Sequence, residues 1–194
     1  EALPIQVTLP GQHMVINAAA AACIGQLLGL SREQIAEGIC KVAPVGGRSH
    51  LIRLEKYEDC TLIDDCYNAN PVSTKAALDL LSMATNRKMA VLGDMFELGE
   101  KEETLHKEVG AYAAKLGIDR IVCIGKLSRQ MYEEAKKALE STGSAKEALY
   151  FATKEEFLKA LEEKKQEWLP CHTVLVKASH GMGFARIVEL LQEQ

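Results

Sequence analysis

The stretch LIDDCYNANP at residues 62–71 decides the fold, because it runs an apolar strand directly into acids, amides, an aromatic ring and a proline. A strand that ends this way and leads into a helix is typical of the ligand-facing edge of an α/β sheet. We expect the helix to begin near Val72 or Ser73 and to be capped by Ser73 or Thr74. Free backbone N–H groups would then face a phosphate or a ribose.

A plainer interpretation of the same stretch stays open. Asp64 and Asp65 would only solvate the end of a strand, and Asn70-Pro71 would be a turn without a ligand.

Strands and helices alternate on both sides of this stretch. Two helices are expected first, at 14–29 and 32–42, and then two strands, at 49–56 and 60–65, joined by a short polar turn. The later expected elements are helices at 72–84, 101–116, 127–140, 154–167 and 182–193 and strands at 88–92, 120–124, 148–151 and 172–177. Short apolar strands separated by amphipathic helices predict an α/β fold with a Rossmann-like, doubly wound, mostly parallel sheet, and the early hairpin adds an antiparallel edge strand.

Three further stretches carry chemistry. LPGQHMVINA at residues 9–18 opens a small-residue helix in which the amide of Asn17 needs a partner. PVGGR at residues 44–48 ends in a glycine-flanked Arg48, whose guanidinium could meet a phosphate bidentately, although a solvated loop arginine is an equal alternative. VLGDMFELG at residues 91–99 is another strand that stops at a glycine and an aspartate.

Together with VKASHGM at residues 176–182, these motifs resemble the Mur ligase family in order and spacing over almost the whole chain. The resemblance is strongest to the member that joins D-alanyl-D-alanine to UDP-N-acetylmuramoyl-tripeptide in peptidoglycan synthesis. It implies a cytoplasmic ligase that forms an amide bond through an acyl phosphate, with ATP and Mg²⁺. Residues 1–47 would be the helical end of a central ATP-binding domain, and 48–194 the C-terminal ligase domain.

The resemblance also implies site residues, none of them catalytic in the covalent sense. The expected ATP contacts are Asn17 at the adenine, Arg48 at a phosphate and Asp65 at the ribose hydroxyls, with Tyr67, Asn68 and Asn70 shaping the lip of that pocket. The expected dipeptide contacts are Asp94, Glu97, Lys177, Ser179 and His180.

Two positions depart from the family pattern. Met14 stands where relatives commonly carry an asparagine, which leaves a contact near the base in doubt. His180 stands where arginine is frequent, so we expect dipeptide binding to weaken above neutral pH.

The sequence lacks the G-x-x-x-x-G-K-[ST] loop that cradles nucleotide phosphates, so the chain by itself is expected to be inactive and the Mg²⁺ ligands to lie mainly in the missing central and N-terminal domains. Two alternatives remain: a sibling ligase that adds a single amino acid, or a stand-alone nucleotide-binding module without catalysis. A dinucleotide site is not indicated, because no G-x-G-x-x-G follows a strand.

Composition narrows the class further. A net charge of −4 with interspersed signs argues against nucleic-acid binding. No apolar run predicts membrane insertion or a signal peptide, and the longest one, 15–30, is expected to be a buried helix. The six cysteines show no metal or disulfide spacing and are expected to be reduced, with alkylation of Cys66 blocking the nucleotide site. Isolated His50, His106 and His172 are each expected to be surface residues or to pack in the core.

Overall fold

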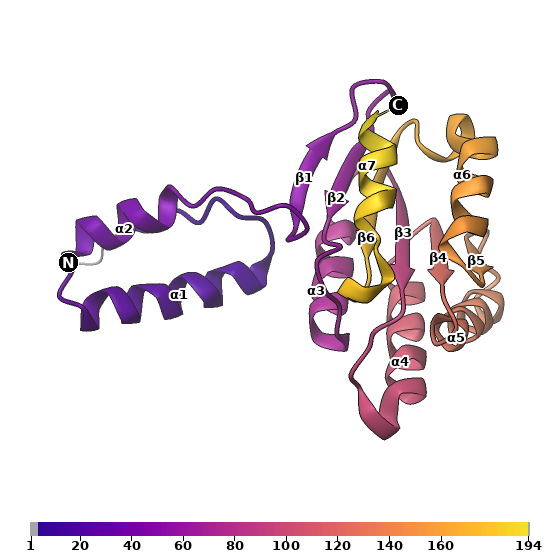
Figure 1. Cartoon of the computed structure of the whole chain (residues 1–194), viewed down its shortest axis with the longest axis horizontal. Helices are drawn as coiled ribbons and strands as arrows, with labels where there is room; N and C mark the ends of the chain where they lie inside the picture. Colours follow the sequence, from indigo (N-terminus) through magenta and orange to yellow (C-terminus); the bar gives the residue numbers. More distant parts are fainter. Residues whose placement is uncertain (1–3, 194) are drawn as a thin grey trace. The chain divides into compact units, whose positions relative to one another are not determined.

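The computed structural model describes residues 4–193 and divides into two compact units, the first ending at Val45 and the second beginning at Gly46. The first unit holds helices α1 (Gln12–Leu27) and α2 (Arg32–Cys40) (Figure 1). Ser31 begins α2 with a capping box, in which its hydroxyl accepts from the backbone N–H of Gln34 and the Gln34 side chain accepts from the Ser31 N–H.

The expectation that the first helix is buried is wrong for this chain. Within α1 only Gly25 is buried, where a Cβ would lie 2.9 Å from the Ile35 side chain. Apolar side chains such as Ile16 and Leu27 are 71% and 88% exposed. Apolar content suggested burial, but a two-helix unit offers only one narrow contact stripe, and the remaining apolar surface of α1 is uncovered.

The second unit is built on a six-stranded sheet with the order β1-β2-β6-β3-β4-β5. The strands are β1 (His50–Arg53), β2 (Thr61–Asp64), β3 (Arg87–Gly93), β4 (Arg120–Ile124), β5 (Glu147–Phe151) and β6 (His172–Lys177). The edge strand β1 pairs antiparallel with β2, and all other pairs are parallel. The predicted mostly parallel sheet with an antiparallel edge strand is thereby confirmed.

Helices cover both faces of this sheet (Figure 1). One face carries α3 (Pro71–Ser82), α4 (Glu102–Lys115) and α5 (Ser128–Ser141), and the other carries α6 (Lys154–Trp168) and α7 (Ala185–Glu193). The two cores follow the period-two alternation of the strands, so that Met89 and Val91 of β3 face α6 and α7 while Ala90 and Leu92 face the other layer.

The helix starts that differ from the predicted ones include those of α3 and α7. Helix α3 begins at Pro71 and is capped by Asn70, whose side chain accepts from the backbone N–H of Ser73, not by Ser73 or Thr74. Proline at the first helical position has no N–H to satisfy, which explains the earlier start. Helix α7 begins at Ala185, because residues 180–182 form a 3-10 turn closed by Gly183 at φ 62°.

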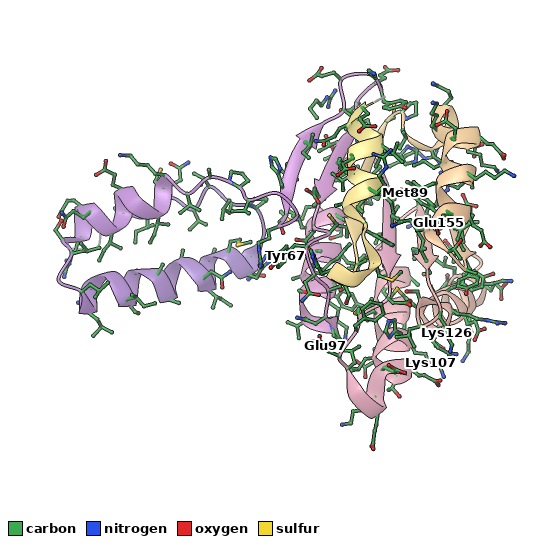
Figure 2. The ribbon with its side chains drawn as sticks, in the orientation of Figure 1. Tyr67, Met89, Glu97, Lys107, Lys126 and Glu155 are labelled. Atoms are coloured by element: carbon green, nitrogen blue, oxygen red, sulfur yellow. The ribbon has the colours of Figure 1, made fainter. Side chains whose placement is uncertain are left out.

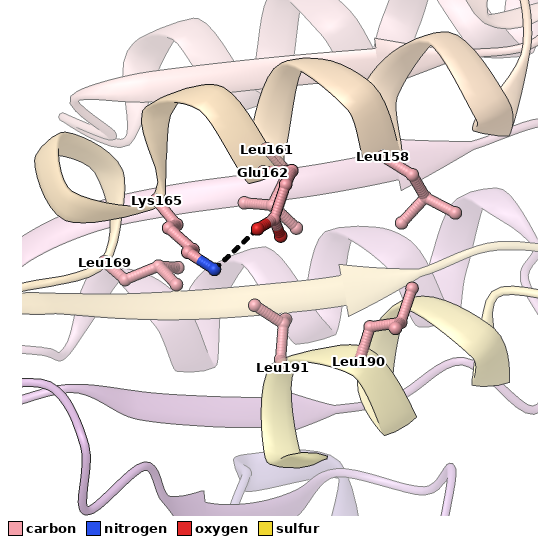
Figure 3. A pocket seen from close by; sticks show the side chains of 7 residues that line it. All are labelled: Leu158, Leu161, Glu162, Lys165, Leu169, Leu190 and Leu191. Carbon is pink, nitrogen blue, oxygen red and sulfur yellow. Dashed lines mark hydrogen bonds and ion pairs between the residues drawn. The ribbon is translucent and has the colours of Figure 1, made fainter. Parts of the chain in front are cut away.

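A small hollow separates α6 from α7 (Figure 3). Leucines line it, and the ammonium of Lys165 lies 2.7 Å from the Glu162 carboxylate. A leucine-rich lining closed by one ion pair is typical of helix packing. None of the helices in residues 4–193 has the length and apolar character needed to cross a membrane.

The strand order creates a switch point beside β6. Strand β6 lies between β2 and β3, which continue into α3 and α4 on one face, whereas β6 continues into α7 on the other face. Loops that leave neighbouring strands toward opposite faces open a crevice at the carboxyl edge of the sheet, and ligands of such sheets bind there.

Candidate functional site

A polar hollow lies at this switch point, and we call it the three-loop hollow. Its volume is about 660 Å³, including the part open to solvent. The loops after β2, β3 and β6 line it with Asn68, Ala69, Asn70, Phe96, Glu97, Leu98, Ser179, His180 and Gly181. Figure 2 labels Glu97, which lies in the loop after β3, and Tyr67, which precedes the hollow-lining residues of the loop after β2.

The three-loop hollow brings together residues that the sequence analysis assigned to two ligands. Asn68 and Asn70 were expected at ATP, and Glu97, Ser179 and His180 at the dipeptide. Sequence reasoning missed Phe96, which is 40% exposed at the rim although it is aromatic. An exposed aromatic residue directly after a buried strand is the signal that could have found it.

Ser179 ties the three loops to one another. Its hydroxyl accepts a hydrogen bond from the backbone N–H of Phe96 at 2.8 Å and donates to the carbonyl of Ala69 at 3.4 Å. Its own N–H donates to the carbonyl of Asp94 at 3.0 Å. The side chain is buried, so its polar atoms are engaged with protein groups and not with bulk water.

Asp65 and Lys177 form a buried ion pair beside the hollow. The Lys177 ammonium donates to Asp65 Oδ2 at 2.5 Å and to the carbonyl of Asn68 at 2.9 Å. The other oxygen of Asp65 accepts from the N–H of Ser49 at 2.8 Å, and Ser49 holds a left-handed backbone at φ 48°. Both side chains are therefore already paired, so a ligand would have to compete for them or use the backbone that they position.

The two aspartates at the end of β2, Asp64 and Asp65, bond to the backbone of another segment and do not only face solvent. Asp64 is also buried, and its Oδ2 accepts from the N–H of Gly47 at 2.7 Å. Gly47 has φ +77°, and a Cβ there would lie 3.0 Å from the Cβ of Tyr67. The plainer interpretation of the two aspartates is therefore wrong, since they fasten the segment before β1 to the loop after β2.

Two aromatic rings and one guanidinium contact one another at the lip of the hollow. The guanidinium carbon of Arg48 lies 4.2 Å from the centroid of the Tyr67 ring, and the Tyr67 and His180 rings are 5.4 Å apart. Arg48 is exposed and Tyr67 is 48% exposed, so both can reach a ligand. A guanidinium on an aromatic face keeps its planar fork of donors oriented.

The expected phosphate site at the start of α3 is weakened by the cap. Pro71 has no N–H, the N–H of Ser73 donates to the Asn70 side chain, and that of Thr74 donates to the Asn70 carbonyl. Few N–H groups of the first turn remain for an anion.

Asp94 and Glu97 differ in exposure although both follow β3. Asp94 is buried, and its Oδ1 accepts from the N–H of Ser128 at 2.7 Å, which anchors the start of α5. Glu97 is exposed in the hollow and holds φ 63°, a backbone that costs a non-glycine residue energy. Of the two, only Glu97 lines the hollow.

Asn17 belongs to the first unit and lies exposed on α1. Its side-chain nitrogen is 3.6 Å from the sulfur of Met14, a weak acceptor. The non-family residue Met14 therefore supplies the partner that this amide was expected to need.

The expectation for Cys66 needs correction. Cys66 is buried, and burial raises the pKa of its thiol to about 12, helped by the hydrogen bond and charge of Asp64. Burial likewise raises the pKa of Cys60 to about 11. Alkylation requires an accessible thiolate, so a reagent should not reach Cys66 in the folded chain.

Among residues 4–193, no three His, Cys, Asp or Glu side chains gather as a metal ion would require. We therefore assign no Mg²⁺ ligand to these residues.

The fold and this site define a class: the chain belongs to the Mur ligase family, whose glutamate ligase domain profile matches residues 47–180. It is 36% identical over 189 residues to UDP-N-acetylmuramoyl-tripeptide--D-alanyl-D-alanine ligase of Bacillus subtilis (strain 168), a match that covers 96% of this chain and 39% of that protein. The ligase of the same name from Escherichia coli (strain K12) is 34% identical over 97% of this chain and 39% of its own length.

A solved structure agrees with these relatives. A crystal structure of MurF from Acinetobacter baumannii superimposes with a TM-score of 0.82 at 29% identity, covering 98% of this chain and 39% of that one. The chain thus spans about 39% of the length of the curated relatives it matches. The predicted family resemblance is confirmed.

Proposed function

We propose that this chain is the C-terminal part of an ATP-dependent ligase that joins D-alanyl-D-alanine to UDP-N-acetylmuramoyl-tripeptide in peptidoglycan synthesis. The observation that carries the proposal is the three-loop hollow, in which exposed Glu97 and His180 share one opening. The names of the curated relatives supply the substrates. We also propose that the first unit is the helical end of the central ATP-binding domain, and that the exposed apolar side chains of α1 pack within that domain.

The proposed reaction has two steps. The terminal carboxylate of the tripeptide attacks the γ-phosphorus of ATP, which gives an acyl phosphate and ADP. The amine of the dipeptide then attacks the acyl carbon, which forms the amide and releases phosphate. Such chemistry depends mainly on positioning the reactants and on neutralising phosphate charge. Magnesium would add positive charge at the phosphates, from ligands outside the described residues.

Charge suggests how the hollow would hold the dipeptide. D-alanyl-D-alanine carries an amine at one end and a carboxylate at the other. We assign the amine to the exposed carboxylate of Glu97 and the carboxylate to the imidazole of His180. Ser179 would fix the distance between them by tying their loops together.

The nucleotide would lie at the lip. We assign a phosphate of ATP to the Arg48 guanidinium, which lies over the Tyr67 ring. Asn68 and Asn70 would contact the nucleotide at the same edge of the hollow. Asn17 and Asp65 remain proposed ATP contacts, Asp65 through the loop that it holds. Lys177 and Asp94 remain proposed dipeptide residues that act by fixing the loop backbone, because their charged groups are already paired.

The decisive experiment measures phosphate release by the complete ligase that contains this chain. With ATP and the UDP-linked tripeptide, we expect release with D-alanyl-D-alanine and none with D-alanine alone. Release with a single amino acid but not with the dipeptide would indicate a sibling ligase. ATP binding without any ligation would indicate a stand-alone nucleotide module. Either result would overturn the proposal.

Matched variants test the two assignments. Arg48→Gln should raise KM for ATP about tenfold or more, since a charge-assisted phosphate contact is lost. Glu97→Gln should raise KM for the dipeptide instead. Arg129→Gln is the control, because Arg129 is an exposed arginine whose partner, Glu133, lies on the same helix. It should change neither KM.

A further inference from the structure

His106 is a fully buried side chain on α4 that does not line the three-loop hollow. Its Nδ1 lies 2.7 Å from the carbonyl oxygen of Glu102. A carbonyl oxygen only accepts hydrogen bonds, so Nδ1 carries the ring proton. The second nitrogen, Nε2, then has a free lone pair and accepts from the backbone N–H of Met95 at 3.0 Å.

Met95 lies near the start of the loop that enters the hollow. Its N–H is held by His106, and the next N–H, that of Phe96, is held by the hydroxyl of Ser179. Two successive amides are thus fixed by side chains from two other elements. Glu97 follows with φ 63°, a strained backbone that persists only where its surroundings determine it.

We propose that His106 is a positioning residue for the dipeptide site, because its Nε2 lone pair fixes the loop that presents Phe96 and Glu97 to the hollow. The proposal rests on the function proposed above, since it assumes that the hollow takes the dipeptide. His106 would thus contribute to the dipeptide site from outside the hollow, through the hydrogen bond between its Nε2 and the N–H of Met95.

The chain contains a closely matched control. His172 is also buried, and its Nδ1 also lies 2.7 Å from a backbone carbonyl oxygen, that of Pro170. Its Nε2, however, has no hydrogen-bond partner among the described residues. The two histidines therefore share burial and the Nδ1 bond, and differ in the contact that the proposal invokes.

The experiment compares His106→Leu, His106→Gln and His172→Leu at pH 7.5 in two assays. Amide hydrogen exchange at Met95, measured on this chain, should accelerate about tenfold or more in His106→Leu, because a buried N–H loses the acceptor that His106 supplies. Glutamine offers an oxygen near the position of Nε2, so His106→Gln should restore most of the protection. His172→Leu should leave Met95 unchanged.

Kinetics of the complete ligase form the second assay. His106→Leu should raise KM for D-alanyl-D-alanine about tenfold and change KM for ATP less than twofold, and His106→Gln should recover most of the loss. Equal effects of His106→Leu and His172→Leu on Met95 exchange and on the dipeptide KM would overturn the inference. An inactive wild-type ligase would instead contradict the proposed function, while the exchange assay would still decide whether His106 holds the loop.

Discussion

The ammonium of Lys177, at the end of β6, lies 2.5 Å from the carboxylate of Asp65, at the end of β2, and both side chains are buried. The pair joins two neighbouring strands where their loops diverge to form the hollow. Its members were expected to serve different ligands, yet each is the other's partner.

Removing one member of this pair should destabilise the fold strongly. Lys177→Met leaves the Asp65 carboxylate buried and unpaired, so we expect a loss of about 3 kcal/mol in the free energy of unfolding, measured by urea denaturation. Lys75→Met is the control, because Lys75 is 33% exposed and pairs with Glu108, which is 50% exposed. That change should cost less than about 1 kcal/mol. Equal losses would contradict a buried, structural pair.

A side chain at position 47 should lower the free energy of unfolding. Gly47→Ala combines a positive φ, which costs about 1–2 kcal/mol for a residue with a Cβ, with a contact to the Tyr67 backbone. Gly143→Ala has a similar strain at φ +61° but open space around the new Cβ. Urea denaturation should therefore show a larger loss for Gly47→Ala, and the difference reports the contact with Tyr67. A loss no larger than that of Gly143→Ala would show that Tyr67 moves away freely.

Much of the fold could be predicted from the sequence because its cause is local. The strand β4, for example, is the predicted 120–124 without change, since apolar residues flanked by turn signals define it. The Asn70 cap was also within reach, because Asn70, Pro71 and Ser73 together form a capping box with proline at the first position.

Other features depend on contacts that no local pattern encodes. The insertion of β6 between β2 and β3 brings Lys177 to Asp65 across 112 positions of sequence. His106 was predicted only to pack, because nothing in its neighbourhood reveals that the Met95 N–H lies against its ring. The site was therefore predictable as three motifs, and the bonds that hold those motifs together were not.

Ser179 and Ser128 should respond in opposite ways to the loss of a hydroxyl. Ser179→Ala leaves the part-buried N–H of Phe96 without this acceptor, so we expect a loss of about 1 kcal/mol in unfolding free energy and a higher KM for the dipeptide. The Ser128 hydroxyl is buried and has no partner among the described residues. Ser128→Ala should therefore be neutral or slightly stabilising. A costly Ser128→Ala together with a harmless Ser179→Ala would refute the role given to Ser179.

His172 should make the fold sensitive to mild acid. Burial lowers the pKa of its imidazole, and the positive charges of Arg87 and Arg120 lower it further, against the opposing effects of the Pro170 carbonyl and Asp119. In the unfolded chain the pKa returns to about 6.5, so the unfolded state binds more protons below that pH. The contribution of the neutral His172 side chain to the free energy of unfolding is therefore fully present above about pH 6.5. It is lost as the pH falls through the lowered pKa that this imidazole has in the folded chain.

Comparing unfolding free energies at pH 7.5 and pH 5.5 tests this linkage. The wild-type chain should lose more stability over this interval than His172→Leu, because the variant has no imidazole to protonate at this position. Other groups titrate in both proteins and cancel in the comparison. Because His172 lies at the start of β6, opposite the strand end that carries Lys177, the acid-induced loss should appear in unfolding before it appears in ligand binding at the hollow. Identical pH dependence in the two proteins would mean that the folded chain accommodates the charged imidazole without cost.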